Sequence, residues 1–224
     1  MNQERWTAVD QYFTDLLVPA DAALEEALRS SAEAELPAIS VTPNLGKLLM
    51  LLAQMQGARN ILEIGTLGGY STIWLARALP KGGRLITLEA EEKHAKIARA
   101  NIARAGLADM VEVIVGKALD TLPKLAAKGA GPFDLIFIDA DKPSNPDYFA
   151  WAMKLSRVGS VIIIDNVVRD GAVIDAGSED ASVQGVRRMN QLIAAERRVS
   201  ATAIQTVGSK GYDGFAIARV TETQ

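Results

Sequence analysis

Short apolar runs alternate along this chain with segments whose apolar residues recur at helical spacing. The strand-like runs lie at residues 60–64, 84–88, 111–115, 133–138 and 161–164. They are almost continuously apolar, as are the strands of a parallel sheet that helices cover on both faces. Two further runs, 199–206 and 215–220, are joined by a connection too short for a parallel crossover, so they are expected to pair antiparallel. The pattern predicts an α/β fold with a mostly parallel sheet.

Apolar residues also recur at helical spacing before the first strand, from Trp6 to Leu17 and again around Leu24 and Leu28. We therefore expect one domain over residues 1–224, with a helical extension at 1–38 and an α/β core at 39–224. The default role of the two N-terminal helices is to cover an edge or face of the sheet. A dimer contact or a wall of a substrate pocket is the alternative.

The first apolar run leads into the glycine-rich stretch Gly65-Thr66-Leu67-Gly68-Gly69, and a helical segment begins near Tyr70. Such a strand–turn–helix unit opens at the carboxyl end of a strand, where open α/β sheets bind ligands. The glycine order lacks the second glycine of the dinucleotide fingerprint. Glu89 ends the next run, where an acid can accept hydrogen bonds from both hydroxyls of a ribose or cap the following helix. A generic turn without a ligand is the alternative.

Composition narrows the chemistry. Hydrophobic residues make up 49% of the 224 residues, which favours a sizeable core over disorder. The chain has no cysteine and a single histidine, His94, so a Ser-His-Asp triad and a zinc site of the usual nitrogen and sulfur kind are both excluded. His94 lies among charged residues in the first turn of a predicted helix, so we expect it to be a solvated surface residue.

Charge and hydropathy limit the partners. The formal net charge is -3, and Lys and Arg form no basic stripe of the kind that nucleic acid requires. The N-terminal residues lack the apolar segment of a signal peptide, and no apolar run approaches the length of a membrane span. We therefore expect a cytoplasmic protein with a small-molecule substrate and no nucleic-acid or membrane partner.

Oxygen-bearing side chains follow two of the strand-like runs. Asp139 and Asp141 come after the fourth run, and Asp165 and Asn166 come after the fifth. We expect these two strands to be neighbours, so both groups should lie at their carboxyl ends near the glycine-rich turn. Carboxylate and amide oxygens are hard ligands that suit Mg²⁺, Mn²⁺ or Ca²⁺. The alternative is that each acid caps the next helix or turn.

Asn145-Pro146 bears on that alternative, because Asn at an N-cap with Pro at the first helical position would already cap the helix after the fourth run. This makes it less necessary for Asp139 to act as a helix cap, which weakens the capping alternative for Asp139. Lys142 lies beside the predicted ligands, and its spacing leaves a catalytic role and an ordinary surface position both open.

Three motifs together make the chain resemble a known family, the cation-dependent, S-adenosylmethionine-dependent O-methyltransferases that include catechol and caffeoyl-CoA O-methyltransferases. The motifs are residues 63–71, 139–142 and 165–166, and the resemblance covers about residues 39–220. The first motif is typical of many methyltransferases, whereas its combination with the other two is specific.

The resemblance implies a Rossmann-like, doubly wound, seven-stranded sheet whose last strand is antiparallel, and a homodimer. It implies that the cofactor lies against a set of residues on several elements: Val41, Glu63, Gly65, Thr66 and Ser71 around methionine, Glu89 at the ribose, Ala118 at the adenine, and Asp139. It also implies the metal ligands Asp139, Asp165 and Asn166, and Lys142 as the general base. Arg169 departs from the pattern, since several relatives carry an aromatic residue at the corresponding place.

The predicted reaction is methyl transfer from S-adenosylmethionine to a hydroxyl of a catechol-type molecule. The methyl group of a sulfonium is already activated, so positioning supplies much of the catalysis. A divalent cation chelated by two vicinal hydroxyls would lower the pKa of one of them and set its direction. Two other functions stay open: an NAD-dependent oxidoreductase and a non-catalytic module that senses a nucleotide or metal.

Overall fold

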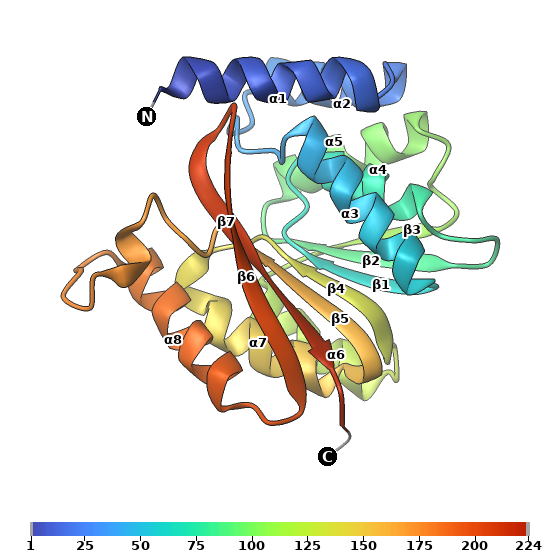
Figure 1. Ribbon diagram of the computed structural model, residues 1–224. Coiled ribbons are helices and arrows are strands. Elements are labelled where there is room, and N and C mark those ends of the chain that lie inside the picture. The colour runs from blue at the N-terminus through green and yellow to red at the C-terminus, as the bar shows by residue number, and fades with distance from the viewer. Residues whose placement is uncertain (1, 223–224) are drawn as a thin grey trace.

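The apolar runs form the central strands of a single sheet in the computed structural model, which describes residues 2–222 (Figure 1). The strands are β1 (Asn60–Ile64), β2 (Arg84–Glu89), β3 (Val111–Val115), β4 (Phe133–Ile138), β5 (Ser156–Asp165), β6 (Val199–Gly208) and β7 (Gly211–Val220). Their order is β3-β2-β1-β4-β5-β7-β6. Strands β1 to β5 are parallel, and β7 is antiparallel to both β5 and β6. The predicted seven-stranded, doubly wound α/β fold is confirmed.

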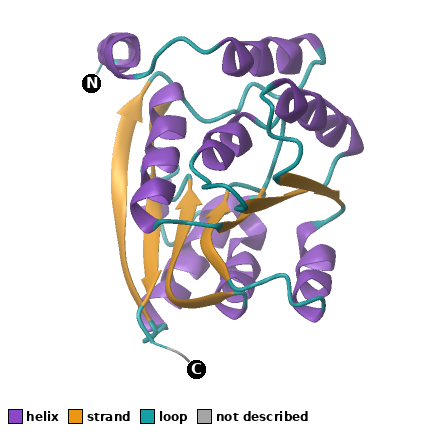
Figure 2. Ribbon diagram, turned by 90° about the vertical axis from the view of Figure 1, so that its right-hand side faces the viewer, coloured by secondary structure: helices purple, strands orange, loops and turns teal. Residues whose placement is uncertain are grey.

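Helices cover both faces of this sheet. They are α1 (Gln3–Leu17), α2 (Ala22–Glu33), α3 (Pro43–Gln56), α4 (Tyr70–Arg77), α5 (Glu92–Arg104), α6 (Ala118–Ala127), α7 (Asn145–Lys154) and α8 (Ala181–Ala195), with 3-10 turns η1 (Lys142–Ser144) and η2 (Ala172–Ile174). Helices α3, α4 and α5 lie on one side of the sheet, and α6, α7 and α8 lie on the other (Figures 1 and 2). Two apolar clusters, one for each face, form the core.

Local sequence accounts for several of these elements. Every residue of β4 is buried, which is why the run is apolar without alternation. Helix α3 begins with Thr42, whose side chain accepts a hydrogen bond from the Leu45 N–H, and Pro43 occupies the first turn. It ends at Gly57, which has the left-handed conformation (φ 63°) of a common helix stop.

The two N-terminal helices differ in how they pack. Helix α2 buries Leu24, Ala27 and Ser31 and contacts α4 and α5, so it packs on the helical layer and not on the sheet itself. Helix α1 lies across β6 and α3 and has no buried residue. Helix α1 therefore meets the edge strand β6 but stays largely exposed, whereas α2 is packed against other helices.

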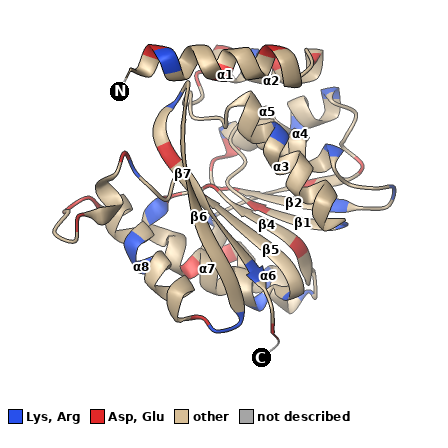
Figure 3. Ribbon diagram, in the orientation of Figure 1, with Lys and Arg blue, Asp and Glu red and all other residues tan. Residues whose placement is uncertain are grey.

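The strand order also determines where a ligand can bind. The order reverses between β1 and β4, because the connection from β1 leads outward to β2 while β4 lies on the other side. A crevice opens at the carboxyl ends of strands at such a point. Lys and Arg are scattered over helices and loops in Figure 3 and form no continuous stripe in that view. Within residues 2–222, no helix combines the length and apolar character needed to cross a bilayer.

Candidate functional site

The glycine-rich turn brings the end of β1 against the end of β4. Gly65 has φ 102°, and a Cβ there would lie 2.1 Å from the Asp139 carbonyl oxygen. The Asp139 N–H donates to the Ile64 carbonyl oxygen at 2.8 Å. Only glycine allows this approach, so Gly65 positions Asp139 as well as the turn. Gly69, at φ 83°, precedes α4 and allows the chain to enter the helix.

Glu63 lies beneath this turn and is fully buried. Its carboxylate accepts hydrogen bonds from the hydroxyls of Ser71 (2.6 Å), Thr72 and Thr87 (2.7 Å). Burial raises the pKa of Glu63 to about 7, although the three hydroxyl donors oppose the shift. Glu63 was expected beside the cofactor, but it is absent from the cavity wall and supports Ser71, which does line the cavity.

Glu89 bonds the backbone of the same turn. Its Oε2 accepts the N–H groups of Thr66 (3.2 Å) and Leu67 (2.7 Å), and its Oε1 accepts the Glu91 N–H at 3.0 Å. The N-cap of α5 is Glu91, so Glu89 is not the cap of that helix. A carboxylate has about four acceptor positions, which leaves room for one hydrogen bond from a ligand hydroxyl.

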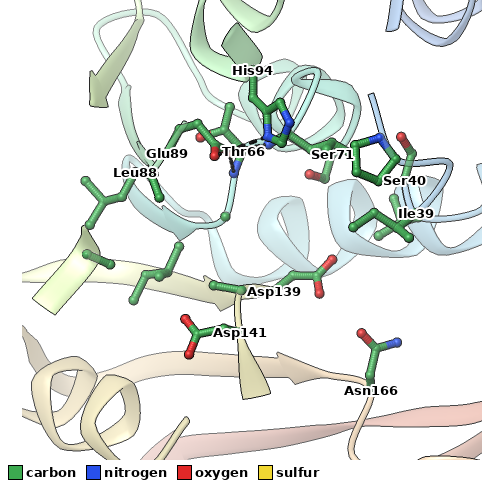
Figure 4. A pocket seen from close by; sticks show the side chains of 18 of the residues that line it. Ile39, Ser40, Thr66, Ser71, Leu88, Glu89, His94, Asp139, Asp141 and Asn166 are labelled. Carbon is green, nitrogen blue, oxygen red and sulfur yellow. Dashed lines mark hydrogen bonds and ion pairs between the residues drawn. The ribbon is translucent and has the colours of Figure 1, made fainter. Parts of the chain in front are cut away.

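His94 corrects one expectation, because it is not a solvated surface residue. It lines the cavity, its side chain is 20% exposed, and its Nδ1 lies 3.4 Å from the Glu89 Oε1 (Figure 4). The first turn of α5 directs the side chain back toward the end of β2. The spacing of five residues between Glu89 and His94 could have indicated that His94 lies in the cavity wall. The charged neighbours of His94 favoured a solvated position instead.

A cavity of about 490 Å³ collects most of the predicted cofactor residues. Those that line it are Val41, Gly65, Thr66, Ser71, Glu89, Ala118 and Asp139. Figure 4 shows Thr66, Glu89 and His94 close together on one side and Asp139 and Asp141 on the opposite side. Its volume is within the usual range for small-molecule and cofactor sites.

The predicted oxygen cluster is brought together by strand register. Ile138 of β4 pairs with Ile164 of β5, so Asp139 and Asp165 leave the sheet side by side. Asn166 follows with φ 57°, a left-handed conformation that Asn tolerates better than most residues. Residues 2–222 contain no group of three His, Cys, Asp or Glu side chains that could hold a metal, since the third member of this cluster is an amide.

Lys142 lies at the same place, in η1. It is 8% exposed, and its Nζ donates to the Asp139 Oδ1 at 2.8 Å, so it is not a surface lysine. Burial and the nearby charge of Asp139 raise the pKa of Asp165, while the Lys142 ammonium opposes the shift. The carboxylates of Asp139 and Asp165 repel each other, and Lys142 alone does not balance both charges. A bound cation would therefore stabilise the pair.

The segment after β4 corrects a second expectation. Ser144, not Asn145, is the residue that precedes α7, and Asn145 lies inside the helix. The Asn145 amide is buried, and its Oδ1 and Nδ2 have no hydrogen-bond partner among residues 2–222. Asp141 directly precedes η1 and its Oδ1 accepts a hydrogen bond from the Tyr148 hydroxyl, so Asp141 stabilises the loop.

Comparison with known proteins agrees with this geometry. A family model described as O-methyltransferase matches residues 17–219. The chain belongs to the O-methyltransferase family. A protein named catechol O-methyltransferase from Niastella koreensis is 58% identical to it, and the match covers 98% of this chain and 100% of the relative.

Solved structures of related enzymes share the whole fold. An O-methyltransferase from Bacillus cereus in complex with S-adenosylhomocysteine (SAH) is 65% identical, with a TM-score of 0.97 over 98% of this chain and 100% of that one. One from Streptomyces achromogenes, involved in tomaymycin synthesis and in complex with S-adenosylmethionine, is 55% identical, with a TM-score of 0.96 over 99% and 100%. This chain is an S-adenosylmethionine-dependent O-methyltransferase. The two alternative predictions, an NAD-dependent oxidoreductase and a non-catalytic sensing module, are therefore wrong.

Proposed function

We propose that the chain transfers a methyl group from S-adenosylmethionine to one hydroxyl of a catechol-type small molecule, with a divalent cation as a second cofactor. The main support is one juxtaposition: Asp139 and Asp165 lie at neighbouring strand ends. Asp139, Asn166 and the buried Lys142 line the crevice that the glycine-rich turn borders, and Asp165 lines the cavity that adjoins it. The relative from Niastella koreensis, named catechol O-methyltransferase, supports the acceptor class.

The cavity wall suggests how the cofactor binds. Gly65, Thr66 and Ser71 would lie around its methionine part together with Val41, which joins them from the loop before α3. At the other end, Glu89 would accept a ribose hydroxyl and Ala118 would lie at the adenine, as the first residue of α6. Asp139 would border the reacting methyl group, because it lies between the turn and η1.

The donor set fits a hard divalent cation. Two carboxylates and an amide supply oxygen, with no nitrogen or sulfur ligand, and the charges of Asp139 and Asp165 face each other. Asp139, Asp165 and Asn166 would hold Mg²⁺ or Mn²⁺, with Ca²⁺ a further candidate. When bound, such a cation would acidify a chelated catechol hydroxyl and orient it.

Lys142 would act as the general base. As a neutral amine, its Nζ would accept the hydroxyl proton while the oxygen attacks the methyl carbon and the carbon–sulfur bond breaks, which leaves S-adenosylhomocysteine. Its hydrogen bond to Asp139 directs Nζ toward the predicted ligands. Burial of Lys142 excludes water from the proton acceptor.

A homodimer completes the proposal, with α1 in the contact. Only one stripe of α1 is half-buried on the rest of the chain, at Trp6, Asp10 and Thr14. An adjoining apolar face is exposed, and its members are Val9, Tyr12, Phe13, Leu16 and Leu17. A helix of fifteen residues gains most of its stability from packing, so we infer that a second copy of this chain covers that face.

The decisive experiment is methyl transfer to catechol with and without EDTA. Activity should vanish when EDTA strips the protein and return with Mg²⁺ or Mn²⁺, and phenol, which has one hydroxyl, should not be methylated. Full activity of metal-free protein in EDTA would overturn the role of the cation, and transfer to no catechol at all would overturn the acceptor class.

Two single variants test the ligands in the same assay. Asp165→Ala should lower activity on the order of a hundredfold with little loss of stability, because it removes a ligand and also the repulsion with Asp139. Asp141→Ala should keep most of the activity and lose stability, since the Tyr148 hydroxyl loses its acceptor. Equal activity losses in the two variants would contradict this assignment of ligands.

A further inference from the structure

A second cavity, of about 600 Å³, adjoins the cofactor cavity, and the two share a wall at Ile39–Val41, Asn166 and Arg169. Apart from the predicted metal ligands, two basic side chains line it, Arg169 and Lys210. We propose that these two cations bind a carboxylate of the acceptor, so that the enzyme prefers a catechol acid to a neutral catechol. The inference rests on the proposed function and names a narrower substrate class for it.

Arg169 lines the cavity and has guanidinium donors without a partner within residues 2–222. It follows Asn166 by three residues and has φ 57°, a conformation that non-glycine residues adopt at a cost. Its Nε is buried and has no hydrogen-bond partner within residues 2–222. The nearest acid is Asp213, whose Oδ2 lies 3.8 Å from the Arg169 Nη1, which is beyond hydrogen-bond distance. The Arg169 side chain is 32% exposed, and neither Nη group makes a hydrogen bond within residues 2–222, so the guanidinium has donors left for a ligand.

Lys210 reaches the same cavity from the connection between β6 and β7. Its Nζ donates to the Ser40 carbonyl oxygen, and an ammonium has three N–H donors, so two are left for a ligand. Loss of surrounding water lowers the pKa of Lys210, while the charges of Asp139 and Asp165 oppose the shift. A partly desolvated ammonium gains from an anionic partner.

Two of the acids that border this cavity, Asp10 and Asp213, already have partners, and a third, Asp170, is exposed to solvent. Asp10 accepts the N–H and hydroxyl of Ser209 and the Asn44 amide. Asp213 accepts the backbone N–H groups of Val168 and Arg169 through Oδ1. These two carboxylates thus stabilise loops, and the charged donors that remain for a ligand belong to Arg169 and Lys210.

The geometry of the cations selects the anion. A guanidinium presents a planar fork that matches a carboxylate, and a lysine adds a point charge beside it. The vicinal hydroxyls would lie at Asp165 and Asn166, and Arg169 lines the wall next to them. Aromatic acids such as 3,4-dihydroxybenzoate and 3,4-dihydroxycinnamate have hydroxyls at one end and a carboxylate at the other.

The test compares each of these two acids with its own amide, which has nearly the same shape and no charge. We expect the wild type to have a higher kcat/KM for at least one acid than for its amide. Arg169→Gln should lower kcat/KM for that acid about tenfold or more. It should change kcat/KM for the corresponding amide about twofold or less. Lys210→Gln should also lower the ratio of kcat/KM for the acid to kcat/KM for the amide. Arg188→Gln, an exposed arginine on α8, is the control with equal charge change.

Binding provides a second readout. Calorimetry with the preferred acid in the presence of SAH and Mg²⁺ should show weaker binding in Arg169→Gln, with SAH affinity unchanged. If catechol is methylated but the acid-to-amide ratio is the same in wild type and both variants, the inference is wrong and the proposed function stands. If the wild type methylates none of the acids, amides or catechol, the proposed function itself fails.

Discussion

Glu89 combines two tasks at the residue scale, because its carboxylate bonds the glycine-rich turn and also lines the cavity. Glu89→Ala should therefore weaken binding of SAH at least tenfold, since each charge-assisted bond is worth roughly 1.5–3 kcal/mol. Isothermal calorimetry measures the change. Glu91→Ala is the matched control, because the Glu91 side chain is exposed and makes no cap bond. Equal affinities of wild type and Glu89→Ala would remove Glu89 from the site.

Glu63 predicts a pH dependence of stability. Its pKa in the folded state, about 7, lies above the ordinary value of 4.5, so the folded protein binds this proton more tightly than the unfolded chain. The stability it contributes is present below about pH 4.5 and is lost as pH rises to about 7. The difference in unfolding free energy between wild type and Glu63→Gln should fall by roughly 3 kcal/mol across that window.

Urea unfolding at several pH values, without cofactor, measures this difference. Glu196→Gln is a suitable control, because Arg198 holds the pKa of Glu196 at about 2, below the window. If the difference in unfolding free energy between wild type and Glu63→Gln stays constant with pH, burial does not raise the pKa of Glu63.

Helix α8 acts on the site at the element scale, because it packs directly on η1, which carries Lys142. A Cβ at Gly185 would lie 2.2 Å from the Lys142 carbonyl oxygen and 2.7 Å from the Pro143 Cα. Gly185→Ala should therefore displace η1, lower kcat and cost about 1–3 kcal/mol of stability. SAH affinity should change less, since the displaced segment carries Lys142 and not the glycine-rich turn.

Steady-state kinetics and urea unfolding of Gly185→Ala test this coupling. Gly177→Ala is the control, because the nearest atom to its added Cβ is an Asp175 side-chain oxygen at 3.5 Å. Wild-type kcat in Gly185→Ala would mean that α8 does not determine the position of Lys142.

The exposed face of α1 makes a prediction at the scale of the whole molecule. Light scattering at micromolar concentration should give about twice the 23.9 kDa chain mass. Phe13→Glu should shift the protein toward the monomer, because a charge in a covered apolar contact is costly. Met55→Glu, which changes an exposed residue at the end of α3, should leave the mass unchanged. A monomer mass for the wild type would contradict the dimer.

The sequence by itself determined the features that depend on neighbouring residues. The apolar run 133–138 had to be a buried strand, and the short connection near Gly211 had to reverse the chain direction. It also predicted the meeting of Asp139 with Asp165, because parallel strands end at the same edge. These inferences need only the strand pattern and the rules of sheet topology.

Tertiary structure decided what depends on contacts between distant segments. Charged neighbours suggested that His94 was solvated, but the direction of α5 brings it to Glu89. Asn145-Pro146 suggested a cap, yet after η1 the helix already begins at Asn145 and Ser144 takes the N-cap position. Arg169 and Lys210 lie 41 positions apart in sequence and line the same cavity only because β5 and β7 pair. Periodicity contains no information on which donors remain unpaired after such elements pack.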